Sequence, residues 1–239
     1  GPGSGTHLPQ AALVEVRPAA RPRVRRRFAA RIARASARPL SALRRLAWAL
    51  AASFMPSRQG ADLGVAFDGD ADRCIFVDDT GAPVSSDLIT ALLVGFLIGG
   101  GRKEAVLYDL RSSHVVPEEI RRFGGVPVRE RVGHSFMKAT MRQRNAVFGG
   151  ELSGHFYWRD NYFADSGAIT MIHVLNVLSQ VRKPLSELLK PLKRYYATGE
   201  VNFDVEDKDG ALKRLEAAFK DGRQDTLDGL TVEYDDWWF

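Results

Sequence analysis

Short apolar runs and amphipathic stretches alternate along the chain from Ala61 onward. Leu63-Gly64-Val65-Ala66-Phe67 is an uninterrupted apolar run typical of a buried strand, and Cys74-Ile75-Phe76-Val77 predicts a second strand after a polar loop. Ser86-Asp87 is a helix N-terminal signal, and three glycines at 99–101 end that helix. Further elements are strands over 105–108, 126–129 and 146–148 and helices over 86–98, 117–123, 135–144 and 166–181. This alternation predicts a layered α/β domain with a mixed sheet over residues 61–190.

Helical spacing also predicts which residues face the core. In the helix over 166–181, Ile169, Ile172, Leu175 and Leu178 are expected on one buried face. A long loop rich in polar and aromatic residues precedes this helix. Its aromatic residues are interpreted as packing the loop, and its aspartates, Asp160 and Asp165, as fixing it.

Residues 191–239 show a different pattern. Residues 199–205 alternate as a strand with one exposed face, 208–220 predict an amphipathic helix with Leu212, Leu215 and Phe219 inward, and 230–234 predict a second strand. The chain ends on Trp237-Trp238-Phe239, which is unlike a natural terminus. We expect this segment to be the truncated start of a small α+β domain.

The net charge of +5 conceals two unlike segments, because residues 1–60 carry +11 from twelve arginines and residues 61–239 carry −6. Gly1-Pro2-Gly3-Ser4 is interpreted as the remnant of an expression tag. The Arg/Ala/Pro-rich sequence up to Gly60 is compatible with four interpretations. They are a disordered basic extension, an organelle transit peptide, a basic amphipathic helix around Leu40–Leu50 on a membrane or nucleic acid, and a reading frame that is not the natural one. We favour disorder or the wrong frame, and expect neither a membrane nor a nucleic-acid partner.

The rest of the composition is that of an ordinary folded protein. The single cysteine, Cys74, excludes an internal disulfide framework and suits a reducing compartment. No apolar run approaches the roughly 20 residues that a membrane-spanning helix needs. We therefore expect a cytoplasmic protein.

The loop Asp68-Gly69-Asp70-Ala71-Asp72-Arg73 is the strongest chemical signal. Three alternating carboxylates after a buried strand repel one another unless a hard divalent cation with oxygen ligands lies between them. An EF-hand is excluded because Arg73 stands where that loop needs glycine and because a strand precedes it. The remaining alternative is a solvated acidic turn. The pattern favours a Mg²⁺ site formed by Asp68, Asp70 and Asp72, with the Arg73 guanidinium suited to a phosphate.

Three motifs in order resemble the α-D-phosphohexomutase superfamily, most closely its phosphomannomutase/phosphoglucomutase branch. They are the loop at 68–73, Gly133-His134-Ser135-Phe136-Met137-Lys138 and Gly150-Glu151-Leu152-Ser153-Gly154-His155. Tyr108-Asp109-Leu110-Arg111 falls where that family has a basic active-site residue. The resemblance covers about 61–239.

The resemblance implies reversible phosphoryl transfer between O6 and O1 of a hexose phosphate, mannose or glucose, through a phosphoserine and a sugar bisphosphate. It implies that the three aspartates ligate Mg²⁺ and that Glu151, Ser153, His155 and Lys138 bind the substrate. It implies that Arg73, Arg111, His134 and His155 are the catalytic side chains. Without the resemblance, histidines such as His134 and His155 are more often loop residues bonded to the backbone, and Lys138 fits a solvated helix residue as well as a functional one.

The chain also departs from that family. No Thr-x-Ser-His-like phosphoserine loop is present, and the chain stops before an Arg-x-Ser-x-Thr-Glu-Pro-like phosphate-binding loop. We therefore expect residues 61–190 to resemble the family's third domain and 191–239 the beginning of its fourth. Such a chain would be inactive alone, with the missing domains 1 and 2 as intramolecular partners. Two alternatives stay open, a non-catalytic module that binds Mg²⁺ or a sugar phosphate, and an Arg-rich N-terminal nucleic-acid or membrane binder.

Overall fold

A five-stranded mixed sheet forms the centre of the α/β domain in the computed structural model, which describes residues 13–16, 30–31, 60–99, 103–198 and 204–239. The strand order is β10-β9-β8-β6-β7. β6 pairs parallel with β7 and with β8, whereas β9 runs antiparallel to β8 and to β10. The strands are β6 (Ala105–Asp109), β7 (Val126–Glu130), β8 (Phe148–Gly150), β9 (Phe156–Trp158) and β10 (Ala164–Asp165). The layered α/β fold with a mixed sheet is confirmed.

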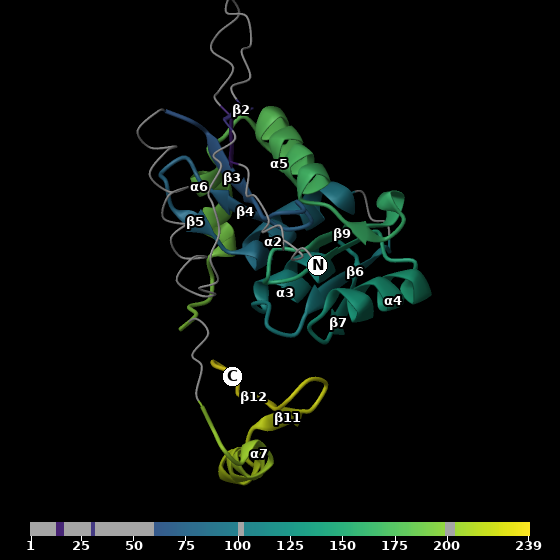
Figure 1. Ribbon diagram of the computed structural model, residues 1–239, viewed down its shortest axis with the longest axis vertical. Coiled ribbons are helices and arrows are strands. Elements are labelled where there is room, and N and C mark those ends of the chain that lie inside the picture. The colour runs from purple at the N-terminus through teal and green to yellow at the C-terminus, as the bar shows by residue number, and fades with distance from the viewer. Residues whose placement is uncertain (1–12, 17–29, 32–59, 100–102, 199–203) are drawn as a thin grey trace, which may run out of the picture.

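Helices cover both faces of this sheet (Figure 1). Val106 and Phe148 pack into the large core cluster with residues of α2, α3 and α5, while Leu107, which points to the opposite face, packs against Met137 and Met141 of α4. The helical elements are α2 (Ser86–Leu97), α3 (Val115–Arg122), α4 (His134–Arg144), η1 (Arg159–Asn161), α5 (Gly167–Val181), α6 (Leu185–Leu189) and η2 (Lys190–Leu192). Among the described residues, no helix is both long and apolar enough to span a membrane.

A second sheet, antiparallel throughout, lies beside the first and holds the two strands predicted around the acidic loop. Its order is β2-β1-β3-β4-β5. The strands are β1 (Leu13–Val16), β2 (Ala30–Arg31), β3 (Leu63–Phe67), β4 (Cys74–Val77) and β5 (Pro83–Val84). β1 and β2 fall in the Arg-rich segment, where no strand was expected. β1 pairs with the edge of β3 that β4 leaves open. An edge strand has unpaired backbone N–H and C=O groups, and β1 supplies partners for those of β3. The predicted helix around Leu40–Leu50 lies outside the described residues.

Close packing explains the two glycines that end β8. A Cβ atom at Gly150 would lie 2.1 Å from the Thr90 hydroxyl oxygen of α2, and one at Gly149 would lie 3.2 Å from the Met141 sulfur of α4. Both helices therefore approach the backbone of β8 from opposite sides. The strand can carry no side chain at Gly150 without displacing α2.

The structure corrects two details of the α/β domain. Ile172 is 52% exposed, and α5 instead buries Gly167, Thr170, Val174 and Val177. Each residue turns a helix by about 100°, so a strict three-residue spacing drifts around the surface while alternating steps of three and four stay on one face. Asp87 does not cap α2. It lies in the first turn and accepts hydrogen bonds from the backbone N–H of Leu88 and of Ser113.

The C-terminal unit, residues 204–239, contains α7 (Lys208–Ala218), β11 (Arg223–Asp225) and β12 (Thr231–Glu233). The prediction that Leu212 and Leu215 point inward is wrong, because they are 42% and 41% exposed. Among residues 204–239, the sheet beside α7 has two strands, which is too little surface to cover a helix face. Most of the strand predicted over 199–205 lies outside the described residues, and β11 was not predicted.

Candidate functional site

The aspartate loop, residues 68–73, closes on itself between β3 and β4. Asp68 accepts hydrogen bonds from the Arg73 backbone N–H at 3.2 Å and from Arg73 Nε at 2.6 Å. Ala71 has φ 61°, and its carbonyl accepts a hydrogen bond from Gly167 N–H at the start of α5. A Cβ at Gly167 would lie 3.0 Å from the Ala71 and Arg73 carbonyl oxygens. The loop is therefore pressed onto the N-terminus of α5, where only glycine fits.

This folding brings three carboxylates together. One oxygen each of Asp68, Asp70 and Asp72 lies within 4.8 Å of the others. The Asp72 Oδ1 atom is buried and has no hydrogen-bond partner among the described residues. Burial, followed by the neighbouring charge of Asp68, raises the pKa of Asp72. Arg73 Nε is the positive group within this loop, 2.6 Å from Asp68 Oδ2 and 3.8 Å from Asp72 Oδ1. The donor set of the three aspartates is oxygen only, which fits a hard divalent cation such as Mg²⁺.

The loop over 150–155 lies directly against the aspartate loop. Cys74 N–H donates to the Gly154 carbonyl at 3.0 Å, and Arg73 and His155 form an isolated antiparallel bridge. Gly154 has φ 94°, and a Cβ there would lie 3.0 Å from the Cys74 carbonyl oxygen. These contacts place His155 Nδ1 3.8 Å from Asp72 Oδ2. Two motifs separated by about 80 residues therefore form one site.

Glu151 lies in this loop but points into the protein. It is 2% exposed and accepts hydrogen bonds from Gly133 N–H at 2.9 Å, the Ser153 hydroxyl at 3.2 Å and the Tyr157 hydroxyl at 3.0 Å. Burial, together with the Glu151 charge, raises the pKa of Tyr157, so that this phenol stays a donor. In this structure Glu151 therefore ties the start of α4 to the 150–155 loop. Its role with a sugar stays a prediction.

Arg111 is held beside the same loop by the buried Asp109. The Asp109 carboxylate, 0% exposed, accepts from Arg111 Nη2 at 2.9 Å, from the Ser112 hydroxyl and from Leu152 N–H. The carboxyl end of β6 is thus joined to the 150–155 loop on β8. The carboxyl ends of the parallel strands β6 and β8 lie at the same edge of the sheet. Arg111 follows β6 and therefore lies at the same edge as the 150–155 loop. Sequence reasoning singled out Arg111 but not Asp109, which positions it.

His155 and Lys138 meet at one carboxylate, that of Asp165. Its Oδ2 lies 2.8 Å from His155 Nδ1, and its Oδ1 lies 2.7 Å from Lys138 Nζ. The His134 ring, on an exposed residue, lies 6.5 Å from the His155 ring. The structure thus brings together both histidines, Lys138 and the aspartate loop. Sequence reasoning treated Asp165 as loop-fixing, and its place at the end of a two-residue strand gave no other signal.

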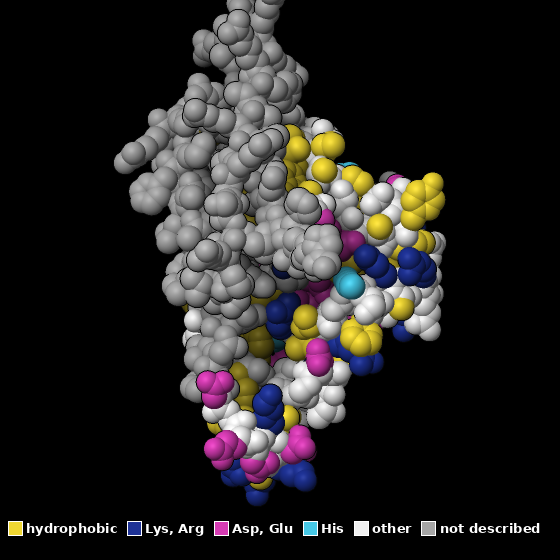
Figure 2. All heavy atoms as spheres, viewed as in Figure 1, with side chains coloured by type: hydrophobic (Ala, Val, Ile, Leu, Met, Phe, Trp, Pro, Cys, Tyr) yellow, Lys and Arg dark blue, Asp and Glu magenta, His cyan; other side chains and the backbone are white. Residues whose placement is uncertain are grey.

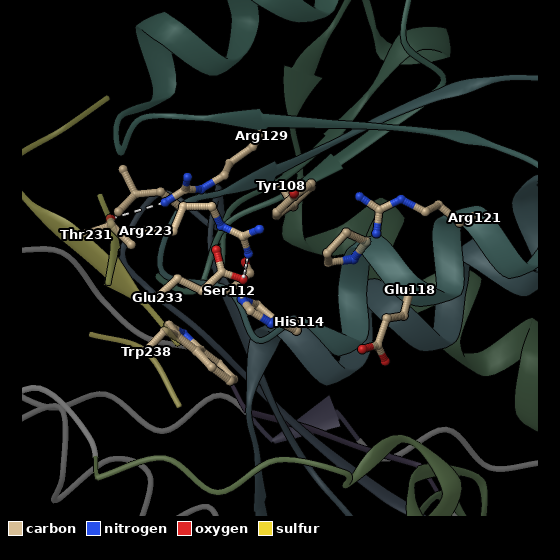
Figure 3. Close-up of a pocket in the computed structure, with 12 residues that line it drawn as sticks. Tyr108, Ser112, His114, Glu118, Arg121, Arg129, Arg223, Thr231, Glu233 and Trp238 are labelled. Atoms are coloured by element: carbon tan, nitrogen blue, oxygen red, sulfur yellow. Dashed lines mark hydrogen bonds and ion pairs between the residues drawn. The ribbon is translucent and has the colours of Figure 1, made fainter. Parts of the chain in front are cut away.

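A cavity of about 260 Å³ lies between the α/β domain and the C-terminal unit, away from the aspartate loop (Figure 3). Arg129 of β7 pairs with Asp225 at 2.6 Å, and Arg223 pairs with Glu233 at 2.7 Å. The His114 ring stacks on Trp238 at 3.9 Å. None of the residues that line this cavity belongs to the aspartate loop or the 150–155 loop. The Arg129–Asp225 pair and the stacking of His114 on Trp238 cross from one part of the chain to the other, which marks this cavity as part of the contact between them.

Comparisons with known proteins show what this chain is similar to. Residues 85–195 match the family model described as phosphoglucomutase/phosphomannomutase, alpha/beta/alpha domain III. A phosphomannomutase of Methanocaldococcus jannaschii is 35% identical over 182 residues, which is 76% of this chain and 40% of that protein. A phosphomannomutase of Salmonella typhimurium is 35% identical over 183 residues, 75% of this chain and 40% of that protein.

The solved structures include a phosphoglucomutase/phosphomannomutase family protein from Burkholderia thailandensis. It superposes with a TM-score of 0.69 at 32% identity, covering 77% of this chain and 40% of that one. The chain therefore spans about 40% of the length of the relatives that it matches. The family model alone covers residues 85–195, from α2 to the end of η2 and the residues just after it.

Proposed function

Since this chain belongs to the α-D-phosphohexomutase superfamily and contains its domain III, we propose that it is part of an enzyme that moves a phosphoryl group between O1 and O6 of a hexose phosphate. The sugar is mannose or glucose, as the names of its relatives suggest. The cytoplasm is the proposed compartment, because the single cysteine suits a reducing one.

The observation that carries this proposal is the convergence of Asp68, Asp70 and Asp72 beside His155. The three carboxylates would hold Mg²⁺, which would neutralise negative charge on the transferring phosphoryl group. Asp72 Oδ1 supports this assignment, because this buried oxygen accepts no hydrogen bond and Arg73 Nε lies 3.8 Å from it, beyond hydrogen-bond distance. Asp68 fixes the Arg73 guanidinium through Nε, so that Arg73 is positioned for a phosphate oxygen.

The other side chains act on the sugar. His155 takes the proton of the attacking hydroxyl, since its Nδ1 lies 3.8 Å from Asp72, one of the carboxylates that would hold Mg²⁺. Lys138, Ser153 and Arg111 orient the substrate from three elements of the same edge, and His134 faces His155 from the start of α4. The family resemblance assigns the phosphoserine donor and a further phosphate-binding loop to domains 1 and 4. We therefore expect no turnover by these 239 residues alone.

Calorimetric titration with Mg²⁺ tests the metal site. We expect the Asp70→Ala variant to bind Mg²⁺ at least about 10-fold more weakly. Removing a residue that only hydrogen-bonds to a metal ligand already costs about 10-fold or more in affinity, and removing a ligand itself should cost no less. Asp160→Asn is the matched control, since Asp160 has a 98% exposed side chain in the same domain. Binding of mannose 1-phosphate should strengthen when Mg²⁺ is present. Equal Mg²⁺ affinity of wild type and Asp70→Ala would contradict the proposal.

A further inference from the structure

Asp165 ends β10 and joins two motifs that lie apart in the sequence. Its carboxylate is 8% exposed, and each oxygen has a separate nitrogen partner. Oδ2 lies 2.8 Å from His155 Nδ1, and Oδ1 lies 2.7 Å from Lys138 Nζ. β10 is held in place by antiparallel pairing with β9, where Asp165 is opposite Tyr157. The backbone of a sheet therefore fixes the position of this carboxylate.

We propose that Asp165 is a positioning residue that keeps the ring proton of His155 on Nδ1, so that Nε2 carries the lone pair. The inference rests on the proposed function, in which His155 takes a proton from a sugar hydroxyl. A neutral imidazole has one N–H and one acceptor nitrogen, and the partner of one nitrogen decides the role of the other. An ionised carboxylate only accepts hydrogen bonds, and therefore selects the Nδ1–H tautomer.

Lys138 completes this arrangement by keeping Asp165 ionised. Burial alone would raise the pKa of Asp165, but the hydrogen bonds from His155 and from Lys138 hold it well below its usual range. The other groups facing His155 are Asp72, whose Oδ2 lies 3.8 Å from Nδ1, the His134 ring at 6.5 Å and the Tyr157 ring at 6.1 Å. Of these, Asp72 is the second carboxylate, and at 3.8 Å it lies beyond hydrogen-bond distance of Nδ1.

Lys138 also makes the inference sharply testable. An ammonium group donates and never accepts, so an amide at position 165 must turn its single oxygen toward Lys138. The amide NH₂ then faces His155 Nδ1 and donates to it, which forces the ring proton onto Nε2. In Asp165→Asn we therefore expect the opposite tautomer. Removing Lys138 as well releases the amide, so that its oxygen can turn back to His155 and restore the Nδ1–H form.

The experiment uses ¹⁵N-labelled chain without metal or substrate, at a pH above which the His155 ring shifts no longer change. Two-bond ¹H–¹⁵N spectra report which ring nitrogen carries the proton. We expect Nδ1–H in wild type, Nε2–H in Asp165→Asn, and Nδ1–H again in the Asp165→Asn/Lys138→Met double variant. Lys138→Met alone should keep the wild-type tautomer. The His173 resonances serve as a control for intact folding.

Three results would overturn the inference: an Nε2–H tautomer in wild type, no change in Asp165→Asn, or no return in the double variant. The first result would instead favour Nδ1 as a ligand, since Asp72, His155 and Asp165 also offer three donor atoms within 4.8 Å of one another. Should Asp165→Asn fail to fold, the wild-type and Lys138→Met spectra still test the tautomer. Because no Mg²⁺ or sugar is present, this outcome is independent of the Mg²⁺ titration that tests the proposed function.

Discussion

The α/β domain and the C-terminal unit differ in how much hydrophobic surface they bury. Of the buried hydrophobic residues in the described chain, Val232 alone belongs to residues 204–239, and all the others lie between Ala61 and Leu192. α7 buries none of its residues. In the space-filling view, charged side chains of both signs gather over the C-terminal unit at the bottom of the molecule (Figure 2).

Aromatic and polar contacts take the place of a core in the C-terminal unit. Phe219 lies 5.0 Å from Phe239 and Tyr234 stacks on Trp237 at 4.7 Å, yet Trp237 and Phe239 are 45% and 42% exposed. Further contacts cross to the α/β domain through Arg129 and His114. Since apolar burial is the main stabilising term in folding, the C-terminal unit depends on its neighbour for its position. The candidate site, by contrast, rests on a fully packed domain.

The largest expected effect is a loss of stability when a side chain is removed from the core of the α/β domain, compared with the same kind of change in the C-terminal unit. Phe148 is 0% exposed, with its ring 4.6 Å from Trp158 and 6.3 Å from Phe156. Phe148→Ala should lower the free energy of unfolding by about 3–5 kcal/mol, because it leaves a cavity that the sheet cannot close. Leu215→Ala on α7 is the control and should change it by less than about 0.5 kcal/mol. Urea unfolding followed by circular dichroism measures both, and equal effects would show that the C-terminal unit shares the core.

Elements that form because of their own hydrophobic periodicity could be predicted from the sequence. Elements that form because a distant strand pairs with them could not. The helices of the α/β domain follow periodicity, and α3, α4 and α5 form within a few residues of the expected ranges. β9 and β10 were missed, because Phe156-Tyr157-Trp158 looks like an aromatic loop until β8 is known to lie beside it. β1 was missed for the same reason, since its partner β3 is distant in sequence.

The candidate site shows the same division. The aspartate loop could be singled out because its chemistry lies within six consecutive residues, and the structure brings its carboxylates together. Asp109 and Asp165 gave no such signal, since each is a single acid whose importance comes from partners brought by the fold. Glu151 carried a motif, but its burial and internal hydrogen bonds could not be inferred from spacing.

A smaller effect is expected where the two regions meet. Arg129→Met removes the pair with Asp225 and the hydrogen bond to Thr231. The two side chains of the pair are 27% and 43% exposed, so the pair is worth about 1 kcal/mol or less after screening by solvent. Amide exchange in β12 should therefore accelerate by about fivefold or less, while exchange in β6 stays unchanged.

Arg144→Met on α4 provides the matched control for that measurement, because Arg144 is exposed and lies on the other face of the sheet. A double-mutant cycle with Asp225→Asn then isolates the pair from the loss of the arginine stem. If β6 exchanged faster together with β12, the C-terminal unit would be an integral part of the α/β domain rather than docked on it.

The smallest expected effect is a pH dependence that belongs to the α/β domain alone. His173 of α5 stacks on Trp158 at 4.2 Å, and burial lowers its pKa although Asp160 acts in the opposite direction. The unfolded chain binds a proton at the ordinary value of about 6.5, whereas the folded chain binds it only at lower pH. The unfolded state therefore holds more protons between the two values, and stability is lost as the pH falls below about 6.5. His173→Phe keeps a ring on Trp158 and removes the charge, so urea unfolding at about pH 7.5 and 5.5 should show a smaller loss of stability than in wild type.

Amide exchange in β12, measured at the same two pH values and corrected for the intrinsic rate, should respond identically in both proteins, because His173 lies in α5 of the α/β domain. A change confined to β12 would contradict the assignment of this pH effect to the core of the α/β domain.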